Sequence, residues 1–397
     1  MAILSCGLGL LVAETGVRLM CKADADGNRY FGNLQLKPYH LPVIRTRQLI
    51  DEYKKSIAGS TMIYDAGVGW APNPGAGEAN RQGFNSTSAN PEKAHQDNLR
   101  IEIFGASYNR GWRKDVENQL SADGMKAEVF DFGVGGYGLD QAYLRWKKQG
   151  QEYHPDIVVL GYCLGTIFDN INMLRLIRHP HSGLPFAKPR FVLSGTGVDL
   201  INVPTPEPDR LAVLMSQLEQ WPLLHYESFY HKADYANTPL RNLMLYALIE
   251  AKLGSLGSNA LRYVSSERTI PARFFRPGDE PVRLALELVK QFRRDVESRG
   301  GKFFVVNLPT AADLAWYRAK GSFPYSEMYA SMQQTVAVIK PEDEMIQTIG
   351  DQKIESFFGD GHYRRELQAV VGRFVASAIA AREKEEIKKP QSAEKRD

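Results

Sequence analysis

The hydrophobic pattern separates an irregular first quarter of the chain from a regular remainder. Residues 22–97 contain short apolar pieces between Gly, Pro and Asn, which form turns, and 85–98 has the composition of a long coil. Four apolar runs rich in β-branched and aromatic residues follow. They lack strict alternation of apolar and polar positions, as is typical of strands buried on both faces, and they cover 101–105, 127–134, 156–164 and 302–309.

Helical patterns lie between and after these runs. In 281–301, Leu284, Leu288 and Phe292 recur at helical spacing, and a Gly-Gly pair ends the pattern. Strands that alternate with helices predict an α/β fold in which helices cover both faces of a parallel sheet. The other helical stretches are 113–121, 139–153, 240–254 and 366–380.

Residues 184–280 interrupt this alternation with Pro-rich loops and helical pieces. We therefore predict one α/β domain over 98–383 that carries a helical insertion at 184–280. An N-terminal extension over 25–97 precedes this domain. The charged, Pro-containing segment 384–397 is expected to be a frayed tail.

The segment 1–24 begins with an almost fully apolar run, AILSCGLGLLVA, at residues 2–13. This run is too short to span a bilayer, but it has the length of a signal-peptide core or of the end of a clipped anchor. No positively charged residue precedes it. We expect export or membrane tethering, and the alternative is a buried amphipathic helix that continues through Glu14 and Arg18.

Charge and cysteine content exclude several functional classes. Lys and Arg number 49 and Asp and Glu number 46, so the net charge of +3 gives no electrostatic footprint for nucleic acid. Cys6, Cys21 and Cys163 lack CxxC spacing, which argues against a zinc ribbon or a disulfide scaffold.

A first candidate for chemistry is Ser107, which directly follows the first predicted strand in the sequence Gly105-Ala106-Ser107. Open α/β sheets bind ligands at the carboxyl edge of their strands. A helix that begins near 109–111 would offer free N–H groups to an oxyanion. From this segment alone, a plain N-cap serine is the simpler interpretation.

The second candidate is GVGGYG at 133–138, after the next strand. Gly133, Gly135 and Gly138 satisfy the G-x-G-x-x-G pattern of dinucleotide-binding folds. The acidic residue that should end the following strand is missing, because Gly161-Tyr162-Cys163 stands there. Nucleotide binding therefore stays the minority interpretation, and we favour a glycine turn that directs a backbone N–H toward Ser107.

The third candidate is Asp360-Gly361-His362, just before the last helical stretch. Residues two apart in an extended segment project to the same side. A carboxylate there can orient an imidazole, and the imidazole can accept a proton from a hydroxyl group. The alternative is an N-cap aspartate with an incidental histidine.

Taken in order, these segments resemble the SGNH (GDSL-type) hydrolase superfamily. The resemblance rests on four blocks and covers about residues 60–383. The blocks are IEIFGASYNRGW, VFDFGVGGYGLDQ, DIVVLGYCLGTIFDN and FGDGHYRRELQAVV.

The resemblance implies a three-layer α/β/α sandwich with a mostly parallel, flavodoxin-like sheet. It also implies a serine esterase or O-acyltransferase, without cofactor or metal, that forms an acyl-enzyme from a carbohydrate or lipid ester. By position, Ser107 would be the nucleophile, His362 the general base and Asp360 the residue that orients the imidazole. The backbone N–H groups of Ser107 and Gly136 would stabilise the oxyanion.

Two positions depart from the family pattern. Ala106 stands where the first block usually has Asp, and Gly165 stands where the third block usually has the Asn that completes the oxyanion hole. Asn109, Thr166 and Asn170 are the candidate replacements. The missing Asn motivates an alternative function, a non-catalytic glycan-binding protein of the cell envelope. Family analogy and the apolar N-terminus favour the envelope or periplasm, with the cytoplasm left open.

Overall fold

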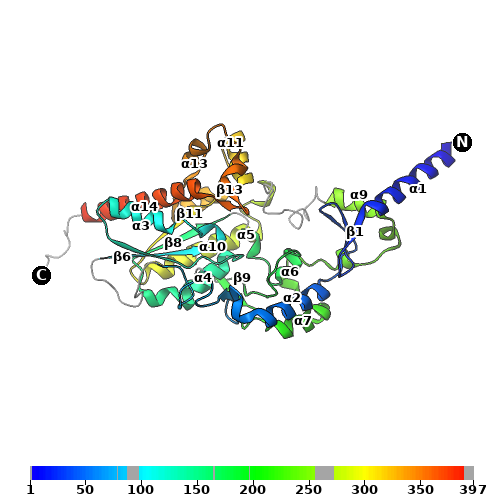
Figure 1. The fold of residues 1–397 in the computed structure, drawn as a ribbon, viewed down its shortest axis with the longest axis horizontal. Helices are drawn as coiled ribbons and strands as arrows, with labels where there is room; N and C mark the ends of the chain where they lie inside the picture. The colour runs from blue at the N-terminus through cyan, green and yellow to red at the C-terminus, as the bar shows by residue number, and fades with distance from the viewer. Residues whose placement is uncertain are drawn as a thin grey trace. The chain divides into compact units, whose positions relative to one another are not determined.

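The computed structural model describes residues 2–77, 79–86, 98–163, 166–195, 197–254 and 272–388. The chain forms two compact units, each assembled from separate stretches of sequence (Figure 1). We call them the N-terminal unit and the sheet unit. The N-terminal unit combines Met1–Trp70, Ile171–Pro189 and Asn202–Ser265, and the sheet unit combines Ala71–Asn170, Arg190–Ile201 and Ser266–Asp397.

A five-stranded sheet, parallel throughout, forms the centre of the sheet unit. Ranked along the chain, its strands are ordered 5-4-3-1-2, which is the flavodoxin-like order. In this order the connections that leave the first and third strands run toward opposite edges of the sheet. Sheets of this kind bind ligands at the carboxyl ends of those two strands. The strands, in their order across the sheet, are β12 (Ala337–Ile339), β11 (Lys302–Asn307), β8 (Ile157–Tyr162), β6 (Leu99–Gly105) and β7 (Ala127–Asp131).

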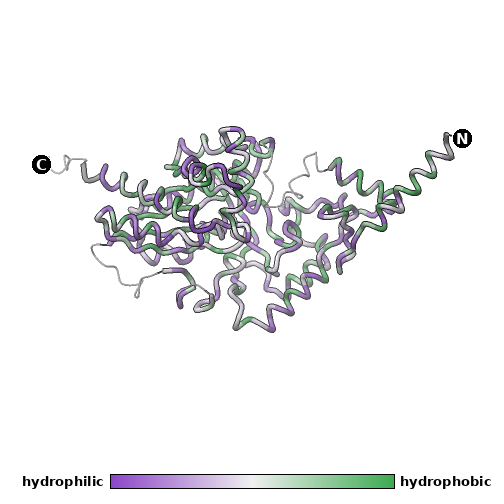
Figure 2. The backbone as a smooth tube through the Cα atoms, turned by 45° about the horizontal axis from the view of Figure 1, so that its top comes forward, coloured by the Kyte–Doolittle hydropathy of each residue, from purple (hydrophilic) through white to green (hydrophobic). Residues whose placement is uncertain are grey.

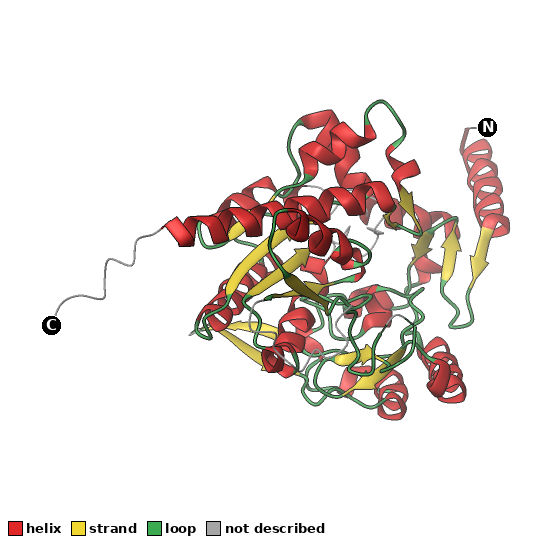
Figure 3. Ribbon diagram, turned by 60° about the vertical axis from the view of Figure 1, so that its left-hand side comes forward, coloured by secondary structure: helices red, strands yellow, loops and turns green. Residues whose placement is uncertain are grey.

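Helices cover both faces of this sheet, as Figures 1 and 3 show. On one face, Ile101 and Ile103 of β6 share a buried apolar cluster with Val116 and Val371. On the other, the ring of Phe104 stacks on Phe132 and meets Phe292 edge-on. Each fully buried side chain of this size contributes about 1.5–3 kcal/mol to folding. The first face carries α3 (Arg113–Ala122) and α14 (Arg365–Lys388), and the second carries α4 (Leu139–Lys148) and α10 (Glu280–Glu297).

Shorter elements complete the sheet unit. The Thr310 hydroxyl caps α11 by accepting from the Asp313 N–H, and the Asp313 carboxylate accepts from the Thr310 N–H. Helix α11 ends at Gly321, whose φ of 70° is the left-handed conformation common after helices. These elements are η3 (Gly150–Tyr153), α5 (Thr166–Asp169), β9 (Arg190–Ser194), β10 (Gly197–Ile201), α11 (Ala311–Lys320), α12 (Ser326–Gln333), α13 (Glu342–Ile349) and η9 (Ile354–Phe357).

The N-terminal unit has a small core of its own. Leu36 packs there with Met244, Ala247 and Ala251, all of which are buried. The first stretch of the chain therefore buries its apolar residues against helices from the predicted insertion. The elements of this unit are α1 (Ala2–Met20), β1 (Cys21–Ala23), β2 (Arg29–Phe31), β3 (Leu34–Leu36), α2 (Val43–Ser56), β4 (Met62–Asp65), α6 (Arg175–Arg178), α7 (Pro208–Ser216), α8 (Lys232–Tyr235) and α9 (Met244–Gly254), and β4 pairs with β5 (Gly69–Pro72).

The predicted fold class is confirmed, and each of the four predicted strands is present. The three-residue strand β12 and the helix α2 were not predicted. The division into units also differs from the predicted boundaries, because parts of 184–280 belong to each unit. The predicted tail is partly helical, since α14 continues to Lys388, and its remainder lies outside the described residues.

Candidate functional site

Ser107 lies two residues beyond Gly105, the last residue of β6, and so at the carboxyl end of that strand. It begins a single 3-10 turn, η2 (Ser107–Asn109), in which the Asn109 N–H donates to the Ala106 carbonyl at 3.1 Å. The helix expected near 109–111 begins later, because α3 starts at Arg113. Ser107 is therefore not the N-cap of α3, and the simple N-cap interpretation is wrong.

His362 is presented by a tight hairpin. Strands β13 (Phe358–Gly359) and β14 (His362–Tyr363) pair antiparallel, with Gly359 opposite His362. The two loop residues, Asp360 and Gly361, have φ values of 49° and 76°. Positive φ at both central residues is the signature of a type I′ turn, for which Asp-Gly is a preferred pair.

The hairpin brings His362 to Ser107, which is 255 residues away in the sequence. The distance from His362 Nε2 to Ser107 Oγ is 2.7 Å, and that from His362 Nδ1 to the carbonyl oxygen of Asp360 is also 2.7 Å. A carbonyl oxygen only accepts hydrogen bonds, so Nδ1 must carry the proton in this contact. In the neutral imidazole, Nε2 then presents its lone pair to the Ser107 hydroxyl, as a general base must.

Asp360 contacts the imidazole through its main chain. We expected its carboxylate to orient His362, and the structure places the carbonyl oxygen of the same residue at Nδ1 instead. The turn explains this difference, because Asp360 is its first central residue and its side chain is exposed. The Asp-Gly pair between Phe358 and Tyr363 was a hairpin signal in the sequence, and it would have predicted this geometry.

Tyr108 links the serine turn to the histidine hairpin. Its hydroxyl group donates to the Gly361 carbonyl at 2.6 Å, and its ring centroid lies 5.3 Å from that of His362. Burial raises the pKa of Tyr108 well above its ordinary value, so the phenol stays protonated as a donor. Two consecutive residues, Ser107 and Tyr108, thus contact two consecutive residues of the hairpin. The sequence held no signal for this role of Tyr108.

Further contacts hold the turn that carries Ser107 and the hairpin that carries His362 in place within the sheet unit. The Tyr363 hydroxyl donates to the Pro309 carbonyl at 2.7 Å, at the carboxyl end of β11. Arg365, the first residue of α14, forms a two-pronged ion pair with Asp115 of α3. A paired guanidinium and carboxylate fix direction as well as distance. These contacts limit how far the histidine hairpin can move from the serine turn.

The glycine-rich loop also lies beside the serine. After β7, the Val134 N–H donates to the Gly105 carbonyl at 3.0 Å, which joins the loop to the end of β6. The Tyr137 N–H then donates to the Val134 carbonyl at 3.2 Å and closes a turn in which Gly136 has a φ of 76°. Gly136 is thus held near the end of the strand that carries Ser107. Its role as an oxyanion donor stays a prediction.

Asn109 is the last residue of η2, and it points into the protein interior. Its side chain is fully buried, and neither its amide nitrogen nor its amide oxygen has a hydrogen-bond partner among the described residues. A Cβ on Gly161 would lie 1.8 Å from Asn109 Oδ1, and one on Gly133 would lie 2.8 Å from Asn109 Cβ. Glycines at the ends of strands make room for this amide. In this conformation its donor is enclosed, so contact with a substrate oxygen would require it to turn outward.

The other candidate replacements lie nearby in the sequence. Asn170 is fully buried, and its side-chain oxygen accepts a 3.3 Å hydrogen bond from the Asp140 N–H in the first turn of α4. The main chain of Thr166 begins α5, and its side chain lies outside what the structure describes. Gly165 also lies outside the described residues. The oxyanion roles of Asn170 and Thr166 therefore stay predictions.

Within the described ranges, no group of three His, Cys, Asp or Glu side chains could hold a metal ion. Cys163 is buried one residue beyond β8, and no disulfide joins Cys6, Cys21 or Cys163.

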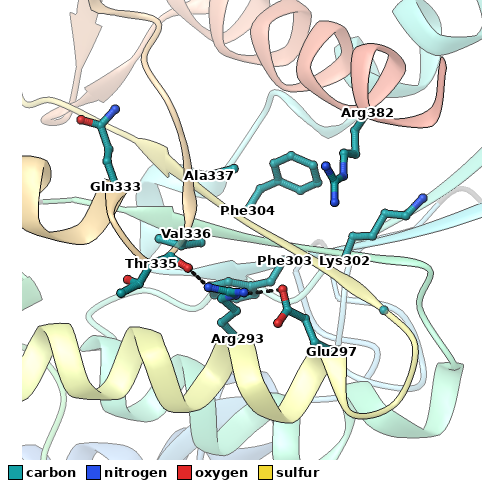
Figure 4. Close-up of a pocket in the computed structure, with 11 residues that line it drawn as sticks. Arg293, Glu297, Lys302, Phe303, Phe304, Gln333, Thr335, Val336, Ala337 and Arg382 are labelled. Atoms are coloured by element: carbon teal, nitrogen blue, oxygen red, sulfur yellow. Dashed lines mark hydrogen bonds and ion pairs between the residues drawn. The ribbon is translucent and has the colours of Figure 1, made fainter. Parts of the chain in front are cut away.

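A cavity of about 480 Å³ lies at the opposite edge of the sheet (Figure 4). It is lined by the amino-terminal residues of β11 and β12, including Lys302 and Ala337. Parallel strands place all amino ends at one edge and all carboxyl ends at the other. The cavity is therefore separate from the site of Ser107, which follows a carboxyl end.

No protein-family model matches the chain, and no curated protein does. Among solved structures, it is similar to a GDSL-like lipase from Bacteroides thetaiotaomicron, at 10% identity and a TM-score of 0.33, over 73% of this chain and 91% of that one. It is similar to a lipase/acylhydrolase from Enterococcus faecalis, at 12% identity and a TM-score of 0.34, over 72% and 96%. It is also similar to an acetyl xylan esterase, at 10% identity and a TM-score of 0.35, over 72% and 99%.

Proposed function

We propose that this chain is a serine ester hydrolase or O-acyltransferase that acts through an acyl-enzyme. The observation that carries the proposal is the 2.7 Å contact between Ser107 Oγ and His362 Nε2. The carbonyl of Asp360 at Nδ1 selects the imidazole tautomer that can remove the serine proton. The site also lies where the flavodoxin-like strand order predicts a ligand.

The reaction would proceed in two halves. His362 Nε2 takes the proton from Ser107 as Oγ attacks the ester carbonyl, and a tetrahedral oxyanion forms. The backbone N–H groups of Ser107 and Gly136 are the proposed donors to that oxyanion. The Nε2 proton then passes to the departing alcohol, which leaves an acyl group on Ser107. Water, or the hydroxyl group of an acceptor, attacks next with the same histidine as base.

The proposed substrate class is an acylated carbohydrate or a lipid ester. It comes from the resemblance of the four sequence blocks, and it is independent of the geometry of the site. The same resemblance and the apolar N-terminus support a location at the cell envelope or in the periplasm.

A fluorophosphonate probe tests the nucleophile directly, because such probes label only an activated serine. We expect wild-type protein to be labelled, Ser107→Ala to abolish labelling, and His362→Ala to slow it by about 10²–10⁴-fold. His225→Ala is the matched control, since His225 Nδ1 also contacts a backbone carbonyl, that of Pro222 at 3.0 Å, on the protein surface. Folded wild-type protein that resists the probe would overturn the proposal.

The non-catalytic alternative rests on Gly165, which stands where the resembled family has an Asn. Losing one oxyanion donor costs about 2.7–4 kcal/mol in other enzymes. A glycan-binding protein with this fold would bind acylated glycans equally well after Ser107→Ala and His362→Ala, and its wild-type form would not release the acyl group.

A further inference from the structure

The first half of α1 is exposed on every side. All residues from 5 to 13 are exposed, and Leu8, Leu10, Leu11 and Val12 have 63% to 67% of their surface accessible. Successive helical residues point in directions about 100° apart, so these four side chains face different ways around the helix. Figure 2 shows the hydrophobic colouring along α1, which extends beyond the other elements of its unit.

The second half of α1 is attached to the start of α9. The Glu14 carboxylate accepts hydrogen bonds from the Met244 N–H at 2.9 Å and the Leu245 N–H at 2.8 Å. Arg18 donates to the Asn242 carbonyl at 2.6 Å. The second half of α1 is therefore joined to α9 by these polar contacts and by Val17, which packs against the cluster that contains Met244.

Helix α9 adds a second apolar strip. Ala247 and Ala251 face inward and are buried beside Leu36. The outward side chains recur at spacings of three and four residues, so they share one face of the helix. These outward residues are Tyr246, Ile249 and Leu253, with 38%, 50% and 63% of their surface accessible, and Leu243, 47% accessible, directly precedes the helix. We call them, together with Leu8, Leu10, Leu11 and Val12, the α1–α9 surface.

The all-round exposure of α1 indicates which occupant covers it. A helix that is apolar on all sides is stable only where apolar material surrounds it, in a protein core or in lipid. A groove on another protein covers one side of a helix, whereas hydrocarbon covers all of them. Among the described residues, no helix is long and apolar enough to cross a membrane.

We propose that the α1–α9 surface binds a lipid bilayer, with the start of α1 inserted into the hydrocarbon and α9 lying at its boundary. Tyr246 then lies at the headgroup level, where amphipathic rings concentrate. Arg18 in the last turn of α1 and Lys22 in β1 are exposed and follow the uncharged run, so the proposal places them at the phosphate groups. This inference does not depend on the proposed catalytic function.

Co-sedimentation with vesicles tests this proposal on the full chain. We expect wild-type protein to bind phosphatidylcholine vesicles, and to bind more strongly when phosphatidylglycerol is added. The variant Leu10→Asp/Leu11→Asp should lose binding, because each charge placed in hydrocarbon weakens insertion on the order of tenfold or more. Ile249→Asp/Leu253→Asp should weaken binding less, since α9 lies at the boundary.

Val213→Asp is the matched control, because Val213 is 58% exposed on α7, away from the α1–α9 surface. Circular dichroism confirms that each variant is folded. Two results would overturn the proposal. One is wild-type protein that stays in the supernatant with both vesicle types. The other is a wild-type dimer that binds no vesicles and dissociates in Leu10→Asp/Leu11→Asp, which would make a second copy of the chain the occupant.

Discussion

At the scale of single residues, the location of one proton on His362 decides whether Ser107 can serve as the proposed nucleophile. The carbonyl oxygen of Asp360 holds that proton on Nδ1 and leaves Nε2 free to accept. A carboxylate would hold the same tautomer and would also stabilise the imidazolium formed during catalysis. A neutral carbonyl oxygen orients the imidazole in the same way, but it stabilises the positive charge of the imidazolium less.

This difference gives a prediction for Asp360→Asn. Asn tolerates the left-handed conformation and keeps the main-chain carbonyl, so we expect fluorophosphonate labelling close to that of wild type. His362→Ala should slow labelling by about 10²–10⁴-fold, because it removes the proposed general base. If Asp360→Asn instead slowed the reaction on the order of 10⁴-fold, as happens when a triad carboxylate becomes an amide, the carboxylate would be the orienting group.

Tyr108 acts on the site through the hairpin. Tyr108→Phe keeps the ring beside His362 and removes the hydrogen bond to the Gly361 carbonyl. A neutral hydrogen bond contributes about 1 kcal/mol, so we expect labelling to slow about fivefold. The effect should be on reactivity, with little change in melting temperature. Tyr317→Phe, which removes a hydroxyl bonded to Asp343 on the protein surface, serves as the control. Equal labelling rates in Tyr108→Phe and wild type would contradict a positioning role.

At the scale of elements, the capping box of α11 contains a carboxyl group with an unusual affinity for protons. Burial raises the pKa of Asp313 from 3.8 to about 6, although hydrogen bonds from Thr310 oppose the shift. The folded state therefore binds this proton more tightly than the unfolded chain does. The resulting stabilisation is complete below about pH 4 and is lost as the pH rises through 6, and the change is on the order of 3 kcal/mol.

Asp313→Asn should remove this dependence on pH. The amide oxygen can still accept from the Thr310 N–H, and it never ionises. We expect the variant to gain stability relative to wild type between pH 4.5 and pH 7.5, measured by urea unfolding at several pH values. A difference in unfolding free energy that stays constant with pH would show that Asp313 titrates normally.

The elements also differ in how visible they were in the sequence. The strands β6, β7, β8 and β11 were predicted because a strand buried on both faces is a continuous apolar run. The strand β12 has three residues, too few for any periodicity. The helix α2 was hidden by the Gly and Pro residues around it. Ser107 and His362 were predicted from motifs, and the structure brings them into contact, whereas the contact of the Asp360 carbonyl depends on the backbone conformation of a two-residue turn.

At the scale of the whole molecule, the fold explains why two segments 255 residues apart form one site. Ser107 follows the first strand of the sheet, and the flavodoxin-like order leaves the carboxyl end of that strand open beside the third. The His362 hairpin precedes α14, which packs on the same sheet face as α3. Each contact described for Ser107 and His362 lies within the sheet unit.

The division into two units therefore predicts that stability and reactivity can be separated. Leu36 is fully buried in the small core of the N-terminal unit, and Leu36→Ala should destabilise that unit by about 2–5 kcal/mol. We expect faster limited proteolysis within residues 1–70, with unchanged fluorophosphonate labelling. Leu120→Ala is the matched control, because Leu120 is fully buried on α3 in the sheet unit and its loss should reduce labelling in mild urea. If Leu36→Ala abolished labelling under native conditions, the site of Ser107 would depend on the N-terminal unit, and the sheet unit alone would not suffice for the chemistry.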